Sequence, residues 1–239
     1  MRLDGFSHHS WPAKSVVANL TPEQREELLS LGRRWEYAAG QALITQGDKG
    51  THVFVLLSGH VKVVKEADSG RTVLLAIRSR GDLVGELAGM DNSVRMARVV
   101  AVGAVAAHVM PFEEFDAFLQ RTPSAFRVVN ASIAAKLRSA TDKIIDFSSQ
   151  EVAVRLARTL LRILDDHARP AAEGTAIGIP LSQPELAAIV GASEPAVHKA
   201  LAELRRRDVL SVGYRSYVVR DLSALRIFAE LPPDIDSRP

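Results

Sequence analysis

The sequence predicts an α+β protein with three parts: an N-terminal antiparallel β-roll (jelly roll), a long dimerisation helix and a C-terminal winged helix-turn-helix. Residues 37–110 predict the first part, because short strand-like runs alternate there with glycine and aspartate turns. Residues 122–148 predict the second through a continuous helical pattern of apolar residues. Residues 181–220 predict the third, since two short helices joined by a glycine turn precede a small hairpin.

The first expected element is a packing helix over residues 22–35. Thr21 is its expected N-cap, and Gln24 is placed to close a capping box. Trp35 extends the apolar face of this helix. The N-terminal arm before it contains adjacent His8 and His9, which we interpret as part of a short solvated segment rather than a metal site.

The β-roll is expected from five strand-like runs, after which a short helix begins at a proline. The runs cover residues 42–45, 52–66, 72–79, 94–100 and 105–110. Residues 111–121, which open with Pro111, predict the short helix.

The long helix carries a seam of core-type residues. Its members are Phe126, Asn130, Ile133, Leu137, Ala140, Ile144 and Phe147, separated by 4, 3, 4, 3, 4 and 3 residues. This spacing is that of a coiled coil, and Asn130 is the polar member that fixes register. We therefore predict a homodimer through residues 122–148, which suits a helix-turn-helix protein that reads paired half-sites. The alternative is a helix packed on its own barrel.

A further helix over about residues 149–167 leads through a loop at 168–176 into the helix-turn-helix. Ser182 is the expected cap of the first short helix, and Glu185 closes its capping box. The core-facing residues of the two helices are Leu186, Ile189, Val190, Val197, Ala200, Leu201 and Leu204. Gly191 supplies the left-handed turn between the helices.

The hairpin that follows predicts a wing. Its strands are residues 209–212 and 216–219, which flank Gly213 and Tyr214. The segment 181–220 holds six lysines and arginines against four acidic residues, a net charge of +2. DNA requires positive potential, and this segment is only mildly positive. A helical hairpin used for packing alone is therefore the alternative.

The expected DNA contacts come from residues that the apolar faces leave outside. They are Ser182, Gln183, Ser193, Glu194, Ala196, His198 and Lys199. Ser182 and Gln183 suit phosphates. Glu194 can accept from a cytosine amino group, and Ala196 can touch a thymine methyl. His198 and Lys199 can reach bases or phosphates.

Composition limits the remaining functions. The 239 residues allow one large domain or two smaller ones, and 47% hydrophobic and 24% charged residues are typical of a globular protein. The chain has no cysteine, which excludes disulfides, thiolate zinc sites and cysteine-held iron–sulfur clusters. No apolar run is long enough to span a bilayer, and the N-terminus lacks a signal-peptide core. We expect a cytoplasmic protein with no membrane partner.

The order of β-roll, long helix and winged helix resembles the CRP/FNR family of bacterial transcription regulators. Three motifs carry the resemblance: GDLVGELAGM at 81–90 with Arg95 after it, TDK at 141–143, and IVGASEPAVHKAL at 189–201. The resemblance covers about residues 20–220.

It implies a domain order along the chain. The expected boundaries are an N-terminal arm at 1–20, a cyclic-nucleotide-binding-like β-roll at 21–121, the dimerisation helix at 122–148, the DNA-binding domain at 149–225 and a tail at 226–239.

The same resemblance implies an effector pocket in the roll. Gly85 lets the backbone approach a ligand, and the ELAG segment that contains Leu87 offers free N–H groups to an anion. Glu86 and Arg95 match the residues that bind a ribose hydroxyl and a phosphate in nucleotide-binding relatives. Thr141 offers a hydroxyl to a purine edge. Cyclic AMP and cyclic GMP are the candidate effectors.

Two departures concern this pocket. Met96 stands where the family's cyclic AMP receptors have Ser or Thr, and Ala140 stands where a hydroxyl residue contacts adenine. The open alternatives are weak binding of cyclic AMP, preference for another nucleotide or anion, and a roll without ligand. In the last case Glu86 and Arg95 form a stabilising ion pair.

A third departure concerns DNA. Glu194 and Pro195 stand where relatives often have Arg-Glu, so the arginine that reads guanine is missing. The preferred DNA site is therefore expected to differ from that of the cyclic AMP receptors.

The leading hypothesis is a homodimeric transcription regulator, not an enzyme, that binds double-stranded DNA and is switched by a small effector. RNA polymerase is a further expected partner. A ligand-independent DNA-binding dimer is the first alternative. The second is a cupin-like metalloenzyme, which needs clustered ligands. The histidines of the roll, His52, His60 and His108, are scattered along the sequence.

Overall fold

The computed structural model describes residues 11–68, 70 and 72–232, so His8 and His9 lie outside the described residues. Contacts divide the chain into two compact units. The first holds the chain up to Leu137 apart from Thr72–Leu74, and the second holds the remainder from Arg138 onward together with that short segment. The long helix contributes residues to both units.

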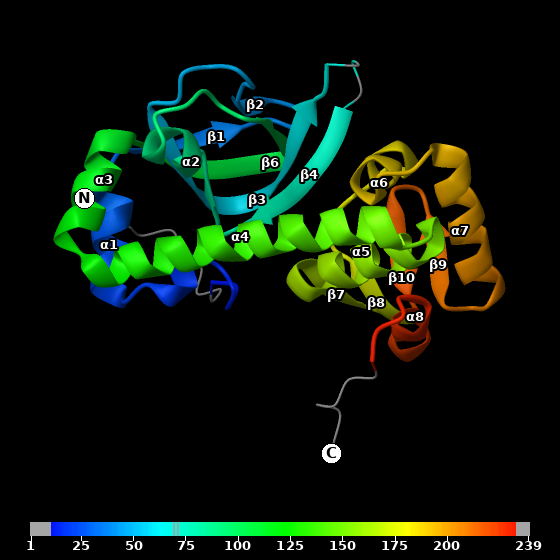
Figure 1. The fold of residues 1–239 in the computed structure, drawn as a ribbon. Coiled ribbons are helices and arrows are strands. Elements are labelled where there is room, and N and C mark those ends of the chain that lie inside the picture. The colour runs from blue at the N-terminus through cyan, green and yellow to red at the C-terminus, as the bar shows by residue number, and fades with distance from the viewer. Residues whose placement is uncertain (1–10, 69, 71, 233–239) are drawn as a thin grey trace. The chain divides into compact units, whose positions relative to one another are not determined.

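The first unit is an antiparallel β-roll with helices around it (Figure 1). Its elements are α1 (Pro22–Ser30), β1 (Arg33–Tyr37), β2 (Ala42–Ile44), β3 (His52–Glu66), β4 (Thr72–Ser79), β5 (Leu83–Val84), α2 (Glu86–Met90), β6 (Arg98–Pro111), α3 (Phe112–Arg121) and the first part of α4 (Pro123–Ser149). The sheet has the order β1-β6-β3-β4, with β2 on β6 and β5 on β3. The α+β class and the predicted roll are confirmed.

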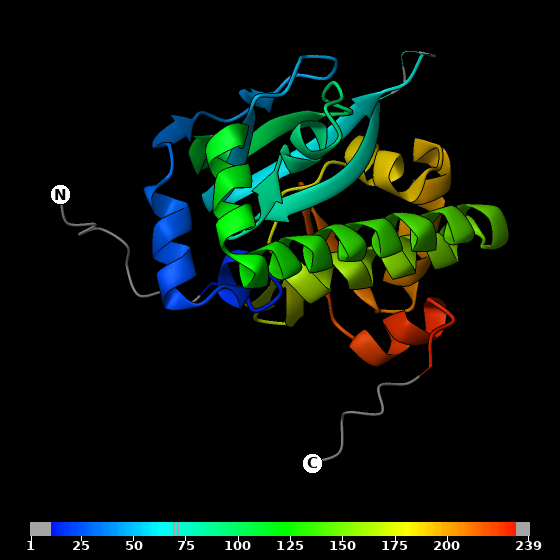
Figure 2. The ribbon, with the colours of Figure 1, turned by 60° about the vertical axis from the view of Figure 1, so that its left-hand side comes forward.

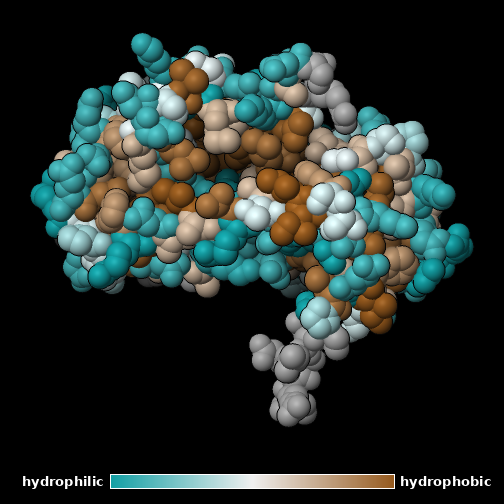
Figure 3. Space-filling model, in the orientation of Figure 1, coloured by the Kyte–Doolittle hydropathy of each residue, from teal (hydrophilic) through white to brown (hydrophobic). Residues whose placement is uncertain are grey.

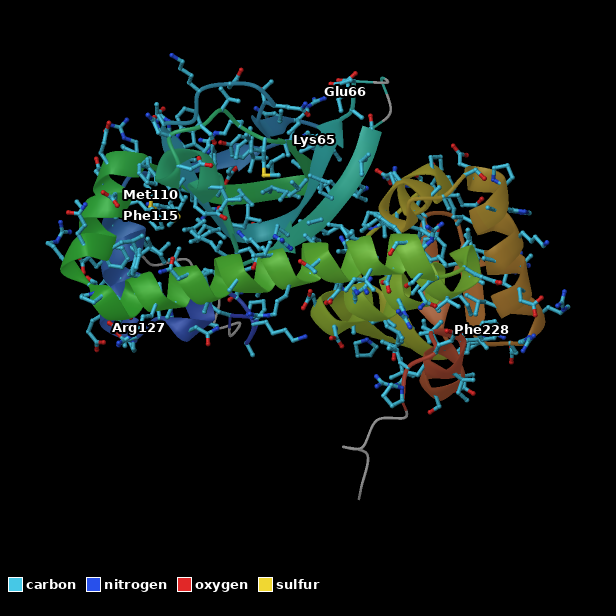
Figure 4. The ribbon with its side chains drawn as sticks, viewed as in Figure 1. Lys65, Glu66, Met110, Phe115, Arg127 and Phe228 are labelled. Atoms are coloured by element: carbon cyan, nitrogen blue, oxygen red, sulfur yellow. The ribbon has the colours of Figure 1, made fainter. Side chains whose placement is uncertain are left out.

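The longest strands, β3 and β6, organise the core of this unit. Their register runs from His52↔Pro111 to Val64↔Arg98, with shifts around Ser58. Met110 and Phe115 are fully buried, and Figure 4 shows them close together where β6 leads into α3. The helices α1 and α3 contact each other at one end of the roll (Figure 2).

The predicted helix over 22–35 is wrong in its second half. The helix ends at Ser30, and Arg33–Tyr37 forms strand β1 with Trp35 in it. Gly32 has φ +74°, and a side chain there would collide with the Val109 carbonyl of β6. This close approach redirects the chain into the sheet. The capping box of Thr21 and Gln24 is confirmed.

Two predicted strand runs merge into one. The runs at 94–100 and 105–110 belong largely to β6, which begins at Arg98 and continues through Gly103 at φ +76°. The residues before Arg98 instead contribute to the pocket described below.

The second unit contains a winged helix-turn-helix. Its elements after α4 are α5 (Val152–His167), β7 (Ala168–Ala171), β8 (Gly174–Ile177), α6 (Gln183–Val190), α7 (Glu194–Arg206), β9 (Leu210–Gly213), β10 (Ser216–Val219) and α8 (Leu222–Phe228). The predicted helix pair and wing are confirmed. The sheet has the order β7-β8-β10-β9.

The predicted loop at 168–176 is wrong, because these residues form the hairpin β7–β8. Gly174, at φ +129°, lies against Val219 of β10, and β8 pairs with β10 through Val218↔Ala176. The wing therefore extends into a larger sheet, which local sequence patterns did not indicate.

Local signals set the two helices of the DNA-binding module. Ser182 and Glu185 form the predicted capping box, and Gly191 has the left-handed values φ +66° and ψ +43°. Ser193 occupies the N-cap of α7 with its side chain making no capping bond. The seven predicted core residues of α6 and α7 are all buried. At the far end of the unit, the Arg207 guanidinium lies 4.8 Å from the ring centre of Phe228, labelled in Figure 4.

Candidate effector pocket and DNA-binding surface

The predicted effector residues of the roll meet around Arg95. Gly85, at φ +90°, caps α2, and Arg95 Nη1 donates to its carbonyl oxygen. Arg95 Nη2 donates to the carbonyl oxygen of His52 at 2.6 Å. Arg95 is only 7% exposed. The guanidinium of Arg95, which we expected to bind a phosphate, therefore donates its Nη1 and Nη2 hydrogen bonds to two backbone carbonyls.

The loop at 47–50 encloses the same arginine. The Arg95 amide donates to the Asp48 carbonyl, and the Gly47 amide donates to the Arg95 carbonyl, each at 2.8 Å. A side chain at Gly50 would collide with the guanidinium, so only glycine allows this approach. Burial lowers the pKa of Arg95, while the charges of Glu86 and Asp48 raise it. The guanidinium remains charged at neutral pH.

Glu86 has a different partner from the one expected. Its carboxylate is 2% exposed and binds Lys136 Nζ at 2.7 Å. Lys136, on α4 within the first unit, also donates to the Leu83 carbonyl at 2.9 Å. The alternative in which Glu86 and Arg95 form an ion pair with each other is not what the structure shows, because each side chain bonds to a different partner. Lys136 was not among the residues predicted from the sequence; its position one residue before the seam residue Leu137 was the available signal.

The other residues predicted for the pocket are exposed. Leu87 is exposed on α2, and Met96 is exposed beside Arg95. Thr141 and Ala140 are exposed on α4 and belong to the second unit. The part of Thr141 in an effector site therefore stays a prediction. Arg95 and Glu86 are both bonded within the roll, so a ligand has to displace the carbonyls from Arg95 or Lys136 from Glu86.

The predicted DNA contacts lie on α6 and α7. Gln183, Ser193, Glu194, His198 and Lys199 are exposed, and Ser182 and Ala196 are half-buried. The buried faces of both helices orient these residues outward. The helix-turn-helix therefore presents a surface with polar side chains along α7.

The wing adds two residues that the sequence analysis did not select. Tyr214 is 93% exposed at the tip between β9 and β10, and Arg215 follows at φ +52°. Nearby arginines are partly neutralised by the chain itself: Arg207 Nε binds Glu203 at 2.7 Å, and Arg220 binds Asp208 at 2.5 Å. The positive potential thus comes from fewer side chains than the sequence count indicates.

The seam of α4 is largely uncovered in the single chain. Leu137 is 67% exposed and Ile144 is 66% exposed, and Phe126 and Phe147 are also exposed. Ala125 and Val129 face the core of the first unit instead, and Ile133 packs partly against it. Figure 3 shows hydrophobic surface in the band where Figure 1 draws α4. Large apolar residues exposed at regular helical spacing indicate a partner surface.

The described part of the chain lacks two further kinds of site. Among those residues there is no group of three or more histidine, aspartate or glutamate side chains that could hold a metal ion, so the cupin-like interpretation gains no support. Within the same ranges no helix combines the length and apolar character needed to cross a bilayer.

Two family models match the chain. The cyclic nucleotide-binding domain matches residues 34–122, and the Crp-like helix-turn-helix domain matches residues 154–228. Together they cover more than half of the sequence and define a DNA-binding transcription regulator with a cyclic-nucleotide-binding domain. The chain belongs to the CRP/FNR family of transcription regulators.

Individual relatives agree with this assignment. The chain is 29% identical over 210 residues to the cyclic AMP receptor protein of Thermus thermophilus, covering 88% of this chain and 94% of that protein. It is 26% identical over 190 residues to a CRP-like cAMP-activated global transcriptional regulator of Mycobacterium tuberculosis, covering 80% and 85%. The structure of the c-di-GMP responsive regulator CLP of Xanthomonas campestris matches with a TM-score of 0.73 at 21% identity, covering 83% and 99%, which shows a shared fold.

Proposed function

We propose that two copies of this chain dimerise through α4 and place their α7 helices in successive major grooves of DNA. The observation that carries the proposal is the pairing of an uncovered seam on α4 with an outward polar face on α7. Dimers of helix-turn-helix proteins read half-sites about one DNA turn apart. Ser182, Gln183, Ser193, Glu194, Ala196, His198 and Lys199 supply the contacts. Tyr214 and Arg215 join them from the wing.

The effector of this regulator, in our proposal, is a cyclic nucleotide held by Gly85, Glu86, Leu87 and Arg95, with Thr141 completing the site. Support comes from the matched domain and from the names of the two curated relatives, both of which refer to cyclic AMP. A phosphate at Arg95 has to replace its bonds to the Gly85 and His52 carbonyls. Effector binding is therefore expected to rearrange the segment around α2.

A second candidate function is a DNA-binding regulator whose roll binds no effector. It is supported by Arg95, because the guanidinium is already bonded to the carbonyls of Gly85 and His52. Titration calorimetry with cyclic AMP and with cyclic GMP separates the two. Heat that saturates at one molecule per chain, and that Glu86→Gln abolishes, supports the effector. Absence of heat with both nucleotides supports the structural roll.

Met96→Ser is expected to tighten cyclic AMP binding about five- to ten-fold. The new hydroxyl supplies a hydrogen bond to the ligand worth roughly 1 kcal/mol, which methionine cannot make. Met96 is exposed, so the change is not expected to disturb folding. Met90→Ser, on the exposed side of α2, is the matched control and should leave the calorimetric affinity unchanged. Equal affinities for Met96→Ser and the parent protein would remove Met96 from the site.

Lys199→Ala is expected to weaken DNA binding about three- to ten-fold and to reduce the salt slope by about one, because it removes one phosphate contact. Fluorescence anisotropy with a labelled duplex at several salt concentrations measures both quantities. Lys65→Ala is the control, since Lys65 is an exposed lysine at the end of β3, labelled in Figure 4. Equal weakening by both changes would attribute the effect to net charge and not to α7.

Three further parts of the proposal follow from DNA binding. The chain acts as a regulator and not as an enzyme; the relative from Mycobacterium tuberculosis is named a global transcriptional regulator. In a bacterium, DNA binding places it in the cytoplasm. RNA polymerase is the expected partner at promoters, which co-purification in the presence of promoter DNA tests.

A further inference from the structure

Ion pairs and hydrogen bonds join the end of α4 to α5 at the corner between the two helices. The first of these helices ends at Ser149 and the second begins at Val152, so only two residues connect them. Contacts group the last turns of α4, from Arg138, with the DNA-binding module. Two consecutive residues of these turns, Asp146 and Phe147, contact α5 and the helix-turn-helix.

Asp146 binds two arginines on successive turns of α5. One carboxylate oxygen accepts from Arg158 Nη1 at 2.6 Å, and the other accepts from Arg162 Nη2. Arg158 Nε also donates to the Ala229 carbonyl at 2.8 Å, at the C-cap of α8. A single carboxylate therefore ties α4 to α5 and, through Arg158, to α8.

The Asp146 carboxylate is buried between two guanidiniums. The Asp146 side chain is 5% exposed. Its burial raises the pKa, but the hydrogen bonds and charges of Arg162 and Arg158 outweigh burial, so the pKa of Asp146 lies below its ordinary value. Removing one member of such a buried group leaves its partners without a counter-charge. The cluster therefore resists separation of the two helices.

Phe147 holds the opposite side of the corner. Its ring packs on Gly191, the turn residue of the helix-turn-helix, where an added Cβ would lie 2.9 Å from the ring carbon Cε1. The Arg155 guanidinium lies 5.6 Å from the centre of the same ring. Arg155 also makes long hydrogen bonds of 3.4 Å to the carbonyls of Phe147 and Gly191. The end of α4 is thus joined to the turn that precedes α7.

We propose that Asp146 and Phe147 are positioning residues that lock the α4–α5 corner, so that residues 138–149 and the helix-turn-helix move as one rigid body. The consequence for regulation rests on the proposed function. A movement of α4 at residue 138 then moves the turn at Gly191 and α7 by the same rotation, because residues 150–151 do not bend. Allosteric coupling of this kind requires such a stiff element between the two sites.

Intramolecular distances test the lock directly. The chain has no cysteine, so Ser139→Cys and Tyr214→Cys provide two exposed labelling sites in the second unit without background. Pulsed electron resonance on doubly spin-labelled chains, diluted with unlabelled protein, measures the distance distribution from α4 to the wing. We expect a narrow distribution in the parent protein and a distribution roughly two-fold wider after Asp146→Asn.

Asp142→Asn is the matched control. Asp142 lies one turn earlier on α4 and lines the same cleft of about 640 Å³ as Asp146, but it is exposed. It should leave the width unchanged. If Asp146→Asn does not fold, Arg162→Gln replaces it as the test. This change removes one of the two ion pairs at a less buried side chain, and it should widen the distribution as expected for Asp146→Asn.

A lower melting temperature of Asp146→Asn with an unchanged width would overturn the proposal, because it would mean that the cluster stabilises the unit without fixing the corner. Equal widening by Asp142→Asn would also overturn it. Because the measurement uses neither DNA nor effector, its outcome is independent of whether the chain binds them.

Discussion

Leu137→Glu combined with Ile144→Glu is expected to convert the protein to a monomer and to abolish tight DNA binding. Burial of a leucine or isoleucine stabilises an interface by about 1.5–3 kcal/mol per side chain, and each change occurs in both copies. The carboxylates also repel across the two-fold axis. The dissociation constant of the dimer should therefore rise on the order of a thousand-fold or more.

Analytical ultracentrifugation over a range of protein concentrations measures this change. The control is Ala135→Glu combined with Ser139→Glu, which adds the same charge at exposed α4 positions outside the seam. A dimer that survives the first pair of changes, or a monomer produced by the control pair, would contradict dimerisation through this seam.

Arg95→Ala is expected to destabilise the β-roll by about 2–4 kcal/mol, whether or not an effector exists. The side chain fills the space against Gly50 and satisfies the carbonyls of Gly85 and His52, which would be left unpaired. For a unit of this size the melting temperature should fall by roughly 6–12 °C. Differential scanning calorimetry of the ligand-free protein measures the change.

Arg95→Lys provides the comparison. A single ammonium cannot reproduce the planar fork that reaches both carbonyls, so an intermediate loss of stability is expected. If Arg95→Ala melts at the same temperature as the parent protein, the buried fork does not stabilise the roll, and Arg95 is free to serve a ligand alone.

Local signals allowed much of the DNA-binding module to be predicted. The capping box of Ser182 and Glu185, the turn at Gly191 and the apolar spacing of α7 all act within a few residues, so the sequence displays them directly. The strands at 52–66 and 72–79 were predictable for the same reason, because each run is rich in valine, leucine and isoleucine.

The wrong predictions concern segments whose structure depends on pairing with residues far away in the sequence. Residues 33–37 became a strand because β6, some seventy residues later, offers them a pairing edge. The β7–β8 hairpin forms because β10 completes its sheet. In the pocket, sequence patterns selected Glu86 and Arg95 but not Lys136 or the carbonyls that bind them, since these contacts exist only after the roll has folded.

In the proposed complex, a symmetric pair of α7 helices reads DNA. Selection of tight-binding duplexes from a random pool by the purified protein, followed by sequencing, tests it most directly. We expect a two-fold symmetric consensus whose half-sites are centred about 10 base pairs apart, and we expect Leu137→Glu combined with Ile144→Glu to abolish its enrichment. Recovery of an unsymmetric sequence, or of no enriched sequence at physiological salt with and without cyclic nucleotides, would contradict it.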